Sequence, residues 1–139
     1  MNYKSGNWYE GSWVNGMPSG QGKLTFANGG SYEGAFSNGL REGKGTLTCA
    51  NGEKYVGDWL NDQRNGKGKC TYASGNVYEG TWKDGLRERQ GKFTYADCAI
   101  YEGTWKDGKK EGKGTFTWAN GDVYDGIWSS DNLVKRTSK

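Results

Sequence analysis

Aromatic and polar residues alternate along short segments of this chain. In one such segment Tyr101, Gly103 and Trp105 alternate with Glu102 and Thr104. A period of two residues is typical of a β-strand whose two faces meet different surroundings. The segment therefore predicts a strand with rings on one face and polar groups on the other.

A second alternating segment follows a glycine-rich stretch at residues 107–112. There Gly114, Phe116 and Trp118 alternate with lysine and threonine, and the dipeptide Asn120-Gly121 closes the unit. Asparagine and glycine both tolerate a positive φ, so this dipeptide is a strong hairpin signal. We interpret each unit as a β-hairpin.

The hairpin unit recurs every 23 residues without an insertion. A tyrosine opens each unit, and a large ring follows four residues later. The tyrosines are Tyr9, Tyr32, Tyr55, Tyr78, Tyr101 and Tyr124, and the large rings are Trp13, Phe36, Trp59, Trp82, Trp105 and Trp128. The chain thus holds five full repeats over residues 9–123 and a half repeat after them, while residues 1–8 fit the end of a repeat, with Tyr3 in the position of Trp118.

The fold predicted from this repeat is all-β: a single-layer, open, twisted antiparallel meander of tandem hairpins with about a dozen strands. We expect the array to occupy residues 1–128. Residues 129–139 are expected to be a C-terminal cap, with a short helix, or a flexible basic tail.

Glycine placement suggests a register for each hairpin. If a hairpin is centred on its Gly-x-x-x-Gly turn, Trp105 lies opposite Gly114, Gly103 opposite Phe116, and Tyr101 opposite Trp118. Trp105 and Phe116 then each rest on the bare backbone of a glycine. The Asn-Gly loop must contain an odd number of residues, since an even one would turn the rings of the next strand to the other face.

Composition narrows the function classes. The 139 residues are only 32% hydrophobic yet 14% aromatic, with 25 glycines, three cysteines, no histidine and a net charge of +3. Without histidine the chain lacks the commonest general base and metal ligand, and its carboxylates repeat about 10 Å apart, too far for paired acid–base work. The cysteines form no CxxC pair, which favours a reducing, intracellular compartment. We expect no enzyme activity and no cofactor or metal.

Residues 78–85, YEGTWKDG, closely resemble the MORN (membrane occupation and recognition nexus) repeat, and the resemblance covers residues 9–128. It implies an elongated antiparallel sheet used for binding. Such arrays resemble scaffolds in cilia and the cytoskeleton, tethers at membrane junctions, and modules appended to lipid kinases or methyltransferases. The resemblance implies a cytoplasmic location, associated with the cytoskeleton, a cilium or a membrane surface.

The repeat pattern is broken at a few positions. Phe36 replaces tryptophan, Val56 replaces glutamate and Asp62 replaces glycine. In the fourth repeat Arg89 and Cys98 stand where glycine is expected. We expect the two turns of that repeat to be the least regular.

A single-layer sheet has no second layer to cover its rings, and exposed aromatic patches usually mark interfaces. We therefore predict a groove that accepts a helix or an extended peptide of a partner protein. Its residues are Tyr32, Tyr55, Trp59, Tyr72, Tyr78, Trp82, Phe93, Tyr95, Tyr101 and Trp105. The alternative is that the rings lie flat over glycine and bury one another, which leaves only a shallow groove.

Basic residues at one turn position suggest a different partner. Arg41, Arg64, Arg87 and Lys110 are predicted to line one long edge of the sheet, where they would face anionic lipid headgroups. Acidic residues follow three of them and partly cancel their charge. Nucleic-acid binding is disfavoured because the basic residues are expected away from the rings.

The sequence therefore leads to a non-catalytic scaffold that binds a protein segment, in a cytoskeletal or ciliary assembly. The alternatives are a peripheral tether to anionic membranes and a targeting module of a larger enzyme. Open sheet edges also permit homo-oligomers or larger assemblies.

Overall fold

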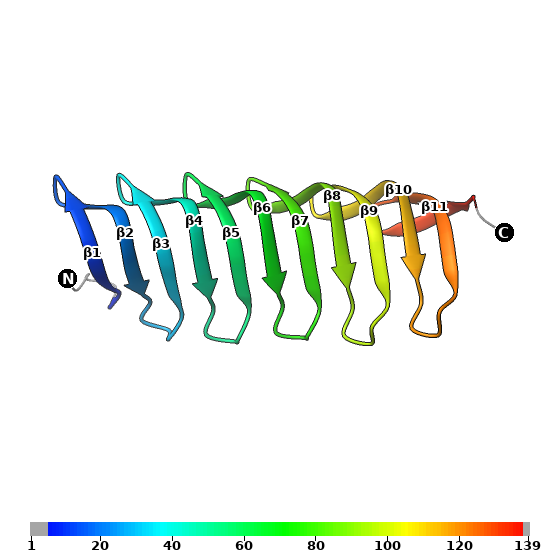
Figure 1. Cartoon of the computed structure of the whole chain (residues 1–139), viewed down its shortest axis with the longest axis horizontal. Helices are drawn as coiled ribbons and strands as arrows, with labels where there is room; N and C mark the ends of the chain where they lie inside the picture. The colour runs from blue at the N-terminus through cyan, green and yellow to red at the C-terminus, as the bar shows by residue number, and fades with distance from the viewer. Residues whose placement is uncertain (1–5, 138–139) are drawn as a thin grey trace.

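The computed structural model describes residues 6–137 as twelve antiparallel strands in one sheet, ordered as in the chain. The strands are β1 (Trp8–Val14), β2 (Met17–Thr25), β3 (Ser31–Ser37), β4 (Leu40–Thr48), β5 (Lys54–Leu60), β6 (Gln63–Thr71), β7 (Val77–Lys83), β8 (Leu86–Thr94), β9 (Ile100–Lys106), β10 (Lys109–Thr117), β11 (Val123–Ser129) and β12 (Asn132–Arg136). Figure 1 shows them side by side from the N-terminal to the C-terminal end. The predicted single-layer meander is confirmed.

Two kinds of connection alternate along the sheet. Asp107 and Gly108 form a tight two-residue turn between β9 and β10, with φ values of 50° and 84°. Positive φ at both residues is the signature of a type I′ turn, whose twist matches that of the strands. After β10, the Trp118 N–H donates to the Asp122 carbonyl at 2.8 Å, which leaves a three-residue loop. The predicted odd loop is confirmed.

The predicted register is wrong. Within the β9–β10 hairpin Gly103 lies opposite Gly114, Tyr101 opposite Phe116, and Trp105 opposite Lys110. The hairpin closes at its tight Asp-Gly turn and not at the centre of the glycine-rich segment, and a β-bulge between Lys110 and Gly114 takes up the extra residues of β10. Glycine therefore faces glycine, which leaves a bare strip of backbone across the sheet.

The short helix expected after residue 129 is also wrong. Ser130 and Asp131 form another tight turn, with φ values of 47° and 73°, and β12 pairs with β11. Residues 132–136 thus extend the sheet. Tyr3 lies outside the described residues, as does Lys139. No helix among residues 6–137 is long and apolar enough to cross a membrane.

The turns of the fourth repeat keep the geometry of the other repeats, contrary to expectation. Arg89 has a φ of 57° and Cys98 a φ of 78°, where the fifth repeat has Gly112 at 78° and Gly121 at 97°. The strands that flank these turns pair in the same register as in the other repeats. The non-glycine residues have adopted the left-handed conformation, which costs them about 1–2 kcal/mol each.

Candidate functional site

The ring-bearing face is organised by tyrosines that cover the glycine strip. Tyr78 is fully buried, and its hydroxyl donates to the Thr81 carbonyl at 2.9 Å. A methyl group on Gly91 would overlap the ring, so only glycine fits beneath it. The same arrangement recurs at each of the preceding and following full repeats. The equivalent tyrosines are Tyr9, Tyr32, Tyr55 and Tyr101.

Tryptophans lock one repeat to the next. The Trp82 ring packs edge-to-face between Tyr55 and Tyr78, with centroid distances of 5.4 and 5.1 Å. Its indole N–H donates to the Gly68 carbonyl at 3.1 Å. Each repeat is therefore bound to its neighbour by ring contacts as well as by the backbone ladder.

In this packing most of the predicted groove residues bury one another, as in the alternative of rings lying flat over glycine. Eight of the ten are at most 7% exposed: Tyr32, Tyr55, Trp59, Tyr78, Trp82, Phe93, Tyr101 and Trp105. Only Tyr72 and Tyr95 remain half-buried. The rings fill one another's gaps, because tyrosine lies flat on glycine and tryptophan fits between successive tyrosines. Most of the predicted groove residues thus form the buried layer beneath the surface of the ring face.

Burial also changes the acidity of these phenols. Because burial disfavours the phenolate, the pKa of Tyr32 rises to about 12, although the charge of Arg41 opposes the shift. The pKa of Tyr101 also rises to about 12 through burial.

The predicted basic edge is wrong in its placement. Arg64 lies in β6 opposite Trp59, and Arg87 lies in β8 opposite Trp82. With the tight turn moved, this series falls inside the even strands, on the same face as the rings. The series is Arg41, Arg64, Arg87 and Lys110. Nucleic-acid binding was disfavoured because the basic residues were expected to lie away from the rings, and this placement removes that argument.

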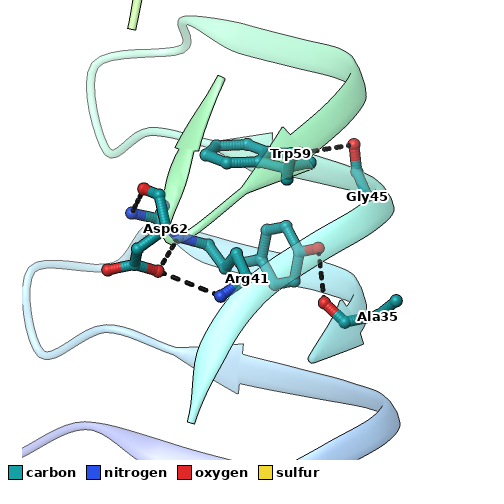
Figure 2. A network of polar contacts seen from close by, with 6 residues as sticks. Ala35, Arg41, Gly45, Trp59 and Asp62 are labelled. Atoms are coloured by element: carbon teal, nitrogen blue, oxygen red, sulfur yellow. Dashed lines mark hydrogen bonds and ion pairs between the residues drawn. The ribbon is translucent and has the colours of Figure 1, made fainter. Parts of the chain in front are cut away.

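In the N-terminal half of the array these cations are neutralised. The Arg41 Nε lies 2.6 Å from Asp62 Oδ1 while its guanidinium carbon stands 4.5 Å from the Trp59 ring centroid (Figure 2). Arg64 pairs with Glu53 at 3.2 Å. Burial alone would raise the pKa of Asp62, but hydrogen bonds from Arg41 outweigh it and hold that pKa below its usual value. Arg41 and Arg64 therefore have internal counter-ions.

In the C-terminal half the cations donate hydrogen bonds to neutral groups. The Arg87 guanidinium donates to the Gly108 carbonyl at 2.6 Å, and the Lys110 ammonium donates to the Tyr95 hydroxyl at 2.7 Å. Among residues 6–137 neither side chain forms an ion pair. The Asp131 carboxylate accepts the backbone N–H of Lys110 at 2.8 Å. Neither side chain is thus ion-paired on the ring face, although the Asp131 carboxylate lies against the backbone of Lys110.

Aromatic rings concentrate beside these two cations. Tyr72 stacks on Phe93 at 5.9 Å, Phe93 contacts Tyr95 at 4.7 Å, and Phe116 contacts Trp118 at 4.4 Å. The corresponding positions of the first two repeats are Leu24, Phe26, Leu47 and Cys49. We define the C-terminal patch as Tyr72, Arg87, Tyr95, Lys110 and Trp118.

Trp118 was missed by the sequence prediction of the groove. Its side chain is 45% exposed, whereas the eight buried rings of the predicted groove are at most 7% exposed. A signal was available, because Trp118 holds the repeat position of Tyr72 and Tyr95.

The opposite face carries a ladder of alternating charge. Lys69 lies opposite Glu79, which lies opposite Lys92, which lies opposite Glu102. Val56 interrupts the ladder beside Lys69 and is 47% exposed. Within the described part of the chain no three acidic or cysteine side chains gather to hold a metal. We attribute this face to cross-strand pairing.

The three cysteines differ in burial. Cys70 is buried as a core filler, Cys49 is half-buried, and all three cysteines are free thiols. Burial raises the pKa of the Cys70 thiol. Cys98 is exposed in its turn.

The sequence profile of the MORN repeat matches five consecutive segments, residues 9–31, 32–54, 55–77, 78–97 and 101–123. The chain belongs to the MORN repeat family. The match to the fourth repeat ends just before Cys98, where this MORN array departs from the glycine pattern.

The MORN array also resembles solved structures. The TCP domain of SAS-4 (dCPAP) from Drosophila melanogaster, solved with a proline-rich motif of Ana2 (dSTIL), has a TM-score of 0.56 and 15% identity, over 91% of this chain and 69% of that one. This likeness shows a shared fold. The TCP10 domain of Danio rerio CPAP, solved with a STIL peptide, has 12% identity and a TM-score of 0.34, over 99% of this chain and 72% of that one. No curated protein sequence matches this chain.

Proposed function

We propose that this MORN array is a non-catalytic scaffold that binds a segment of a partner protein along its ring face, with the C-terminal patch as the contact. The observation that carries the proposal is that the Arg87 and Lys110 side chains form no ion pair among residues 6–137 and lie beside half-buried and exposed rings, whereas Arg41 and Arg64 are ion-paired. Aromatic side chains and partly desolvated cations are the usual energetic centres of interfaces.

The shared fold adds support. The Drosophila TCP domain, whose fold is similar, was solved in complex with a proline-rich motif of another protein. The family resemblance favours a cytoskeletal or ciliary assembly as the setting. In this proposal the buried groove residues, such as Tyr78 and Trp105, hold the patch in place and do not touch the partner directly.

Site-specific photo-crosslinking tests the proposal. We would place p-benzoylphenylalanine at Tyr95, on the ring face, and in a matched protein at Thr94, whose side chain points to the opposite face. We expect protein adducts from position 95 and few from position 94. Equal adduct yields from the two positions would argue against a binding site on the ring face.

An anionic membrane surface is the second candidate, because the same two cations, which form no ion pair within the described residues, attract lipid headgroups. Each charge contributes about 1 kcal/mol near such a surface. Flotation with phosphatidylserine vesicles at moderate salt tests it, with Arg87→Gln/Lys110→Gln against Arg41→Gln/Arg64→Gln. We expect only the first pair to release the protein if the membrane is the partner. Unchanged flotation of both pairs removes this candidate.

A further inference from the structure

The C-terminal patch has the periodicity of the array. Arg87 and Lys110 are 23 residues apart, which is one repeat or two strands. Neighbouring strands lie about 4.8 Å apart, so the two cations recur about 10 Å apart along the sheet. Tyr72, Tyr95 and Trp118 recur at the same interval. A ligand lying along the array therefore meets one cation and one ring in each interval of about 10 Å.

Few peptide conformations match this interval. A polyproline II helix rises about 3.1 Å per residue with three residues per turn, so residues i and i+3 share one side and lie about 9.3 Å apart. In a β-strand, residues i and i+3 point to opposite faces. An α-helix needs seven residues to cover about 10.5 Å, and its width of about 10–12 Å requires a trough. On this face the interlocked rings fill that space, since Trp105 is 3% exposed.

We propose that the partner segment is a polyproline II helix that runs along the array and carries a carboxylate at every third residue. This inference rests on the proposed function, that the ring face binds protein. The carboxylates meet Arg87 and Lys110, and the prolines lie against Tyr72, Tyr95 and Trp118. Aromatic-lined surfaces favour polyproline II because its conformation is already fixed and little entropy is lost on binding. Arginine offers a planar fork of donors that suits a carboxylate.

Synthetic peptides test the spacing. The probe is a fluorescein-labelled peptide of five Glu-Pro-Pro units, measured by fluorescence anisotropy against the intact chain at low salt. A block peptide of the same composition, with its glutamates contiguous, is the register control. Five Lys-Pro-Pro units and a helix-forming peptide with glutamate at every seventh residue complete the set. We expect the Glu-Pro-Pro peptide to bind about tenfold or more tightly than any other. Equal binding of the block peptide, or tighter binding of the helical peptide, overturns the inference.

Charge variants locate the site. Each charge-assisted contact at a half-buried position contributes about fivefold in affinity, so Arg87→Gln/Lys110→Gln is expected to weaken Glu-Pro-Pro binding about 25-fold. The matched control, Arg41→Gln/Arg64→Gln, removes cations that already have counter-ions and is expected to change binding less than twofold. Circular dichroism confirms that both variants are folded. An unchanged affinity of the first pair, or vesicle binding that depends on these cations while peptide binding does not, overturns the inference.

The two proposals fail differently. Protein adducts at position 95 without any preference for the Glu-Pro-Pro peptide overturn the ligand class and leave the binding face intact. The absence of both adducts and peptide binding overturns both.

Discussion

Replacing Gly68 with alanine tests whether the tyrosine over the glycine strip sets the backbone of each repeat. The added Cβ would fall within the volume occupied by the Tyr55 ring, which is fully buried and packs between Trp59 and Trp82 at centroid distances of 5.1 and 5.4 Å. The ring has no free space to enter. Moving it also breaks the hydrogen bond from its hydroxyl to the Asp58 carbonyl, which is 2.9 Å long.

The expected cost follows from these two losses. Overpacking of a filled core costs about 1–3 kcal/mol, and a lost buried hydrogen bond costs about 1 kcal/mol. We therefore expect Gly68→Ala to lower the free energy of unfolding by about 3 kcal/mol. Alanine otherwise stabilises a strand relative to glycine by about 0.5–1 kcal/mol, so the sign of the effect is itself informative.

A double-mutant cycle isolates the contact. Tyr55→Leu removes the distal ring atoms, so Gly68→Ala is expected to be nearly neutral in that background. The coupling energy, from urea unfolding followed by circular dichroism, should be about 2–3 kcal/mol. A cost below about 1 kcal/mol in the natural background, or the same cost in both, would refute the packing account.

Three further measurements address the turns, the phenols and the opposite face. Cys98→Gly is expected to raise the free energy of unfolding by about 0.5–1 kcal/mol, because a φ of 78° suits glycine and the gain exceeds its greater unfolded-state entropy; a loss of stability in urea would contradict this. The pKa of Tyr32 and of Tyr101 is raised from its usual 10 to about 12, so the stability that these phenols contribute is fully present below pH 10 and is lost as the pH rises through 12. Absorbance at 295 nm should show both phenols un-ionised at pH 10 to 11. Full ionisation of both in the folded chain at that pH would contradict the prediction. Val56→Glu is expected to stabilise the sheet by up to about 0.5 kcal/mol by pairing with Lys69, an effect that should vanish in 1 M salt and be absent in Val56→Gln.

The alternation of residues was enough to predict the strands, their faces and the single layer, but not the register. Two parts of each repeat carry a turn signal. Asp107-Gly108 and Asn120-Gly121 are both of the type that favours hairpins, and a glycine-rich stretch follows the first. Only the structure shows that the first is a two-residue turn and the second part of a three-residue loop. The position of the basic series depended on that choice, so it was misplaced by the same error.

Ring exposure was beyond prediction for a different reason. A single layer of sheet suggests that its aromatic side chains are uncovered. The side chains that cover them are nevertheless present in the sequence: the guanidinium carbon of Arg64 lies 4.8 Å from the Tyr55 ring centroid and 5.2 Å from that of Trp82. Whether an arginine lies over a ring or extends from an edge is decided by register. The exposed Trp118 follows from the repeat alone, and comparison of equivalent positions along the chain is what identifies it.

In a repeat array the backbone of each unit is nearly the same, so a functional difference between units must come from substitutions at equivalent positions. The charge of the ring face illustrates this. The residue 21 positions after each cation lies at a tight turn, and it is Asp62 for Arg41 but Gly108 for Arg87. Both turn residues accept the guanidinium through their backbone carbonyl, at 2.9 and 2.6 Å, yet only the aspartate adds a counter-charge. Between these two arginines, one side chain at a turn thus decides whether the guanidinium is ion-paired within the array. The other two cations do not follow this rule: Arg64 has Gly85 at its turn and pairs with Glu53, whereas Lys110 has Asp131 there and directs its ammonium to Tyr95. The two cations without an ion pair lie in the repeats that are richest in rings.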